Sequence, residues 1–160
     1  MSRLLLISIL ALCPLLSAVG RIGETLAECK IRYGEVVRIE RSREDYPQYC
    51  FRKGDIEIRV RLMKGRSGQE IFFGADGGHR MSQSQIDEIL SANSNGLTWQ
   101  QGPPTREAQE KEIYSVSWEL IRSDGAVYAA YSAMARSSFD DLTVETFEFK
   151  KAFEAPATGF

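Results

Sequence analysis

Few side chains in this sequence are suited to catalysis, because its 160 residues include three cysteines and a single histidine. His79 lies in the Gly-rich stretch GADGGHR. A serine hydrolase needs a histidine base together with an ordered acid and a nucleophile. The nearest candidate for the nucleophile, GRSG at residues 65–68, lacks the spacing of a G-x-S-x-G elbow. We therefore interpret His79 as a solvated loop residue and predict that the chain has no catalytic residue and is not an enzyme.

The acidic residues do not form a recognisable metal site. Asp140, Asp141 and Glu145 are the nearest cluster, but they lack the spacing of a calcium loop. They are typical of a turn followed by the solvent face of a strand. The GADGG stretch lacks the Lys-Ser/Thr of a phosphate-binding loop. We predict no metal and no cofactor.

An alternative function remains open at this point. The two carboxylates of a glycoside hydrolase come together only in space, so the sequence does not reveal them. The alternative is a carboxylate-based hydrolase that acts on an extracytoplasmic polymer.

The composition is that of a globular protein. Hydrophobic residues make up 43% of the chain and charged residues 26%. Twenty basic against 22 acidic side chains give a net charge of −2, without the basic excess of a nucleic-acid-binding protein. We therefore expect no nucleic-acid partner.

Residues 1–20 have the pattern of a secretory signal peptide. Arg3 provides a positive charge, residues 4–16 are predominantly apolar, and the small residues Ala18 and Gly20 precede the predicted cut after Gly20. The apolar run contains Pro14 and is shorter than a membrane-spanning helix, so we predict cleavage rather than a retained span. Residue Leu12 before Cys13 argues against lipidation. The predicted location is secreted or periplasmic.

Cleavage would remove Cys13 and leave Cys29 and Cys50 in an oxidising compartment. An even number of cysteines there favours a disulfide. A Cys29–Cys50 bond would contribute about 3 kcal/mol by restricting the unfolded chain. The alternative is two buried free thiols.

The first predicted unit, residues 21–76, begins with a helix over residues 25–33. Thr25 and Glu28 have the spacing of a capping box, and Gly34 is a typical helix end. Hydrophobic alternation and turn residues then predict strands over residues 49–53, 56–63 and 69–73, with an edge strand over 36–40.

A Gly-rich linker over residues 74–85 leads into the second predicted unit, which spans residues 77–160 and includes most of this linker. Ser82 and Gln85 again have capping-box spacing, and the helix they begin ends between Asn93 and Gly96. The remaining predicted elements are a helical turn over 106–112, strands over 113–122, 126–134 and 142–150, and a frayed tail over 151–160. Trp99 and Trp118 are interpreted as core residues.

Together these elements predict an α+β fold of two tandem helix-plus-antiparallel-hairpin units in one compact body. One antiparallel sheet would carry both helices on the face of Ile58 and Val60, and its other face would be open.

The segment Thr25–Gly34, with the pattern T-L-x-E-C-x-x-R-Y-G, resembles the start of uncharacterised small secreted bacterial proteins. The tandem architecture is also similar to that of the beta-lactamase inhibitor protein and of small outer-membrane assembly lipoproteins. The latter similarity implies a binding domain that uses a sheet face or loops, and it carries no site residues.

The candidate binding residues are Arg59, Arg61 and Tyr128. Arg59 and Arg61 alternate with Ile58, Val60 and Leu62, which places them on the open face. Arg and Tyr are frequent anchors of protein interfaces. We therefore predict an exported, non-catalytic interaction module whose partner is a protein or a cell-envelope component.

Overall fold

The structure is a computed structural model that describes residues 20–41, 46–75, 79–102, 114–134 and 137–154. The described helices are α1 (Leu26–Tyr33), α2 (Gln83–Ser94) and α4 (Phe147–Glu154). The strands are β1 (Arg38–Glu40), β2 (Gln48–Lys53), β3 (Ile56–Met63), β4 (Arg66–Gly74), β5 (Trp99–Gln101), β6 (Tyr114–Arg122), β7 (Val127–Met134) and β8 (Asp140–Thr146).

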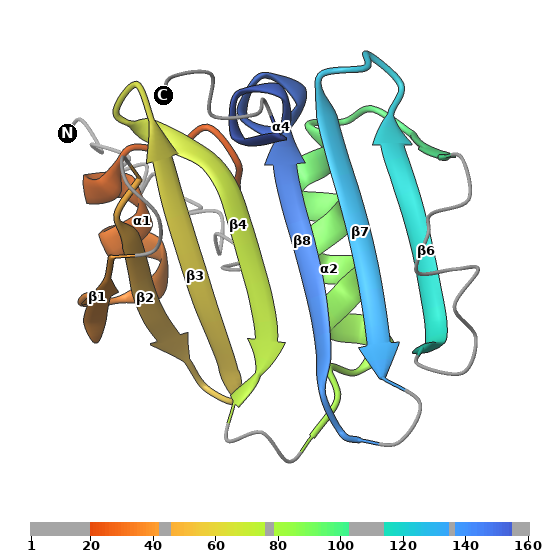
Figure 1. The fold of residues 1–160 in the computed structure, drawn as a ribbon, viewed down its shortest axis with the longest axis horizontal. Helices are drawn as coiled ribbons and strands as arrows, with labels where there is room; N and C mark the ends of the chain where they lie inside the picture. Colours follow the sequence, from red (N-terminus) through yellow and green to blue (C-terminus); the bar gives the residue numbers. More distant parts are fainter. Residues whose placement is uncertain (1–19, 42–45, 76–78, 103–113, 135–136, 155–160) are drawn as a thin grey trace, which may run out of the picture.

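All eight strands form one antiparallel sheet in the order β1-β2-β3-β4-β8-β7-β6-β5. The first four strands along the chain form one half of the sheet, and the last four form the other (Figure 1). The halves meet where β4 pairs with β8, with Phe72 opposite Leu142. The predicted α+β class is confirmed, while the interpretation as two tandem units stays a prediction.

Helices α1 and α2 lie behind the sheet in Figure 1, and we call the face that they cover the inner face. Each helix begins with the predicted capping box, Thr25 with Glu28 and Ser82 with Gln85. Such caps satisfy backbone N–H groups that a helix start leaves unpaired, so they fix where each helix begins.

The hydrophobic core lies between these two helices and the sheet. Alternation along β3 buries Ile56, Ile58 and Val60 on the inner face, and Glu57, Arg59 and Arg61 lie on the opposite face, which we call the outer face. Burying one such aliphatic side chain contributes roughly 1.5–3 kcal/mol. Other buried members of the core are Cys29, Tyr33, Phe51, Phe72, Ile86, Ile89, Val127, Ala129, Leu142 and Val144.

The last described element differs from the prediction. The strand predicted over residues 142–150 ends at Thr146, and the chain continues as α4. The Thr146 hydroxyl accepts a hydrogen bond from the Phe149 amide at 3.1 Å, and the Phe149 and Phe153 rings stack with centroids 5.6 Å apart. The cap and this i,i+4 pair favour a helix over the predicted strand.

Other expectations fall on short or undescribed segments. Strand β5 was not predicted, because three residues are too few to show a period. Trp99 and Trp118 are half-buried against the core, in line with the prediction. The predicted helical turn over 106–112 and residues 155–160 of the predicted tail lie outside the described residues. No helix within the described ranges is long and apolar enough to cross a membrane.

The predicted disulfide is wrong in this structure, since Cys29 and Cys50 are both free and fully buried. Cys29 lies on α1 and packs into the inner-face core. Cys50 pairs with Arg59 across β2 and β3, so its side chain lies on the outer face. The sheet therefore separates the two sulfur atoms. Burial raises the pKa of Cys29 to about 12 and also raises the pKa of Cys50, so both thiols stay protonated at neutral pH.

This arrangement predicts that Cys29 and Cys50 resist alkylation in the folded protein and react fully once it is unfolded. Peptide mass mapping after alkylation in denaturant without a reductant should find both residues modified. A peptide pair joined by Cys29 and Cys50 in that experiment would contradict the structure. Slow alkylation of Cys29 and Cys50 in the native protein is the control that shows that both thiols are buried.

Candidate functional site

The three predicted binding residues all lie on the outer face, which Figure 1 shows towards the reader. Arg59 and Arg61 come from β3, and Tyr128 comes from β7, opposite Glu145. Strands β4 and β8 lie between β3 and β7, so the residues do not form one contact cluster. The alternation along β3 predicted the face of Arg59 and Arg61, but it could not give the separation of the three residues.

A row of polar contacts nevertheless joins Arg61 to Tyr128. Arg61 Nη1 donates to Gln69 Oε1 at 2.7 Å, and Gln69 Nε2 donates to Glu145 Oε2 at 2.8 Å. Lys150 Nζ lies 3.6 Å from Glu145 Oε1 and 4.0 Å from the centre of the Tyr128 ring. Gln69 and Glu145 are both buried, which strengthens these contacts relative to solvated ones. We call these five residues the polar row.

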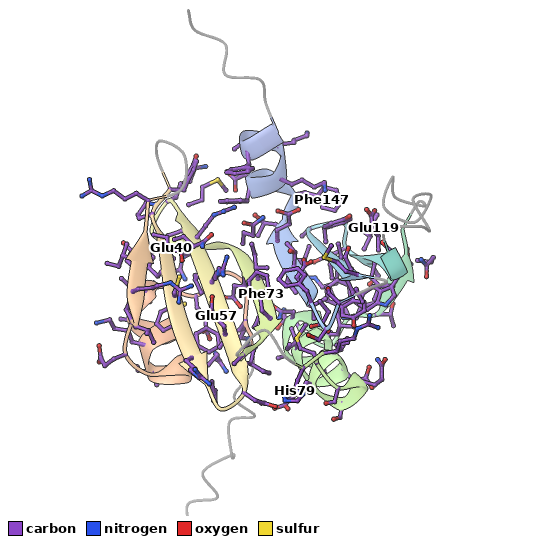
Figure 2. The ribbon with its side chains drawn as sticks, turned by 60° about the horizontal axis from the view of Figure 1, so that its bottom comes forward. Glu40, Glu57, Phe73, His79, Glu119 and Phe147 are labelled. Atoms are coloured by element: carbon purple, nitrogen blue, oxygen red, sulfur yellow. The ribbon has the colours of Figure 1, made fainter. Side chains whose placement is uncertain are left out.

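Ion pairs cover the β1 to β3 part of the outer face. Glu57 Oε1 lies 2.8 Å from Arg38 Nη2 and 2.7 Å from Arg59 Nε, and Arg38 Nε lies 2.7 Å from Glu40 Oε1. Figure 2 labels Glu40 and Glu57 in this part of the sheet. Burial opposes ionisation of Glu57, but the hydrogen bonds from Arg38 and Arg59 outweigh it and lower the pKa of Glu57. This network explains how Cys50 is buried on an otherwise polar face.

One end of the outer face carries an apolar cluster, which we define as Phe73, Phe139 and Met134. The Phe73 and Phe139 ring centres are 5.7 Å apart, and the Met134 amide donates to the Phe139 carbonyl. Phe139 is 44% exposed and Met134 is 39% exposed. The Arg59 guanidinium lies 4.4 Å from the centre of the Phe73 ring. Apolar surface beside a stacked cation is typical of interface anchors.

Helix α4 closes the other end of the outer face. Phe149 is fully buried against Gly68 of β4, and its ring centre lies 5.6 Å from that of Tyr46. From the same helix, Phe153 lies under the Arg61 guanidinium at 5.1 Å. Since α4 also supplies Lys150 to the polar row, it holds both Arg61 and Tyr128. Sequence reasoning missed this role, because it treated the segment as strand and tail.

The other candidates for chemistry lie elsewhere. His79 is exposed, as predicted. Asp140 is buried on the inner side rather than solvated, since its Oδ2 accepts from the Tyr131 hydroxyl and the Met81 amide, both at 2.9 Å. Glu145 is buried in the polar row, so the expectation of a solvated acidic cluster is wrong. Within the described ranges, no group of three His, Cys, Asp or Glu side chains could hold a metal ion.

Comparison with known proteins finds only distant structural similarity. No family model matches the chain, and no curated protein matches it. A solved structure of a cysteine-rich secretory protein from Staphylococcus aureus subsp. aureus Mu50 is similar to it, with a TM-score of 0.46 and 14% sequence identity. The similarity covers 80% of this chain and 45% of the staphylococcal chain.

The packing of α4 against β4 can be tested by substituting Gly68 with alanine. A Cβ atom at Gly68 would lie 2.5 Å from a Phe149 ring carbon, so the ring must move. We expect Gly68→Ala to lower the free energy of unfolding by about 1–3 kcal/mol, measured by urea denaturation. In a Phe149→Leu background, the same substitution should cost less, because the smaller side chain leaves room. An equal loss of unfolding free energy in both backgrounds would show that Phe149 does not pack against Gly68.

Proposed function

We propose that this protein is an exported, non-catalytic interaction module that binds a protein or a cell-envelope component through its outer face. The observation that carries the proposal is the polar row, which links the predicted anchors Arg61 and Tyr128 across four strands. Helices α1 and α2 pack on the inner face, so most of the outer face is available to a partner.

The side chains of the outer face are already held in place. Arg59 is fixed between Glu57 and the Phe73 ring, and Arg61 between Gln69 and the Phe153 ring. Holding a long side chain in one conformation costs roughly 0.5–1.5 kcal/mol on binding, and here that cost has been met during folding. This preorganisation supports a binding role for the two arginines beyond their charge.

Export of the protein is part of the proposal and rests on the signal-peptide pattern of residues 1–20. The predicted cut follows Gly20, and the structure buries Gly20, with an added Cβ 2.9 Å from the Phe72 ring. If the chain is expressed with residues 1–20 in place, the signal peptidase of the host determines the cleavage site. The intact mass of the mature protein then shows whether Gly20 remains.

The binding face is tested with Arg59→Gln/Arg61→Gln in the tagged full-length chain, cross-linked in its own envelope and secreted fraction. Interface arginines contribute about 2 kcal/mol each, so we expect recovery of the partner to fall at least 30-fold. Arg21→Gln/Lys30→Gln is the matched control, because it removes two exposed cations away from the outer face. The measurement is the amount of partner recovered per tagged protein.

A partner retained equally by both double variants would overturn the outer face as the binding surface. Circular dichroism of each variant checks that folding is unchanged. If the unmodified chain itself enriches no stoichiometric partner, the carboxylate-based hydrolase becomes the better hypothesis.

A further inference from the structure

The residues just after the predicted cleavage site form a strap across the inner side of the molecule, which we define as Arg21–Thr25. Ser67 of β4 holds its centre: the Gly23 amide bonds to Ser67 O at 2.9 Å and to Ser67 Oγ at 2.8 Å. The Glu24 amide bonds to the same hydroxyl at 3.1 Å, and the Ser67 amide donates to the Glu24 carbonyl. The Ile22 amide donates to Asn93 Oδ1 of α2 at 2.7 Å. Arg66 Nη1 also donates to the Gly23 carbonyl at 3.0 Å, so the side chains of Ser67, Asn93 and Arg66 all hold the strap backbone.

A carboxyl group is buried close to this strap. Glu70 lies on the inner face of β4, opposite Val60 and Val144, and has no exposed surface. Its Oε2 accepts a hydrogen bond from the Tyr33 hydroxyl at 2.8 Å, whereas its Oε1 has no partner of good hydrogen-bond geometry. An ionised carboxylate offers about four acceptor positions. This site therefore suits the neutral acid better than the carboxylate.

The surroundings of Glu70 make ionisation costly near neutral pH. Burial raises the pKa of Glu70 to about 7, although Tyr33, Ser67 and the Arg21 amide oppose the shift. The negative charge of Glu24 adds to the rise.

The other titratable and charged groups around Glu70 come from α1 and the strap. Helix α1 provides Tyr33, Cys29 and Arg32, and the strap provides Glu24, which is paired with Arg32. The neighbours of Glu70 on β3 and β8 are valines. Arg32 therefore compensates Glu24 rather than Glu70.

We propose that the strap opens when Glu70 loses its proton, so that the inner side of the molecule responds to pH in the neutral range. Moving Arg21–Thr25 away brings water to the carboxylate and satisfies its unmet hydrogen bonds. The same movement widens a cavity of about 330 Å³ whose wall includes the strap residues Arg21, Ile22 and Gly23, with Asn93 and Val127 among its other lining residues.

The direction follows from the proton balance. In the closed state the pKa of Glu70 is about 7, and in the open state a hydrated Glu70 would return to its ordinary pKa of 4.5. The open state therefore binds fewer protons between these values, and its population rises with pH until about pH 7. With these two values, the opening equilibrium constant increases about tenfold between pH 6 and pH 8.

Hydrogen exchange tests this inference in the purified chain. The amides of Ile22, Gly23 and Glu24 report strap opening, and the amides of β7 and β8 report opening of the central sheet. After correction for the intrinsic rate at each pH, we expect strap protection to fall about tenfold from pH 6 to pH 8. Protection in β7 and β8 should change less.

Two variants identify Glu70 as the group responsible. Glu70→Gln keeps the size of the side chain without a titrating proton, so its strap protection should not change with pH. Tyr33→Phe removes the hydrogen bond that favours the carboxylate, so the fall should move to higher pH.

Three results would overturn the proposal. They are constant strap protection in the unmodified chain, an equal fall in Glu70→Gln, and an equal fall in all amides of the sheet. None of these readouts uses a partner, so the test is independent of the proposed function.

Discussion

The pairing of β4 with β8 is the contact on which the rest of the structure depends. It joins the two halves of the chain into one sheet and sets the register across the junction. That register places Gln69 opposite Glu145, which lets the polar row cross from one half to the other. On the inner face it places Glu70 opposite Val144 and leaves it in an apolar environment. A slip of one residue would exchange the two faces and remove both features.

The alternation of side chains explains what the sequence could predict. The alternation of Ile58 and Val60 with Arg59 and Arg61 predicts both the strand and its two faces. With a period of two, no other arrangement buries an apolar side. The capping boxes fixed the starts of α1 and α2 in the same local way. The face of Tyr128 had no such signal, because its strand begins with three consecutive buried residues.

Features that depend on distant contacts escaped prediction. The separation of Cys29 and Cys50 depends on which side of the sheet α1 packs, and residue counting does not show that. The position of α4 depends on the packing of Phe149 against Gly68, which is far away in the sequence. Glu70 gave no local signal, since an acid within a β-strand is ordinarily read as a solvent-facing position.

The two unpaired cysteines, one on each side of the sheet, have a consequence for how the protein matures. Because Cys29 and Cys50 form no disulfide in the described part of the chain, its folding requires neither a thiol oxidase nor a disulfide isomerase. Its yield should be the same in the reducing cytosol as in an oxidising envelope. Within the described residues, glutathione would find no disulfide bond to reduce. The fold of the described residues is therefore insensitive to the redox state of its surroundings.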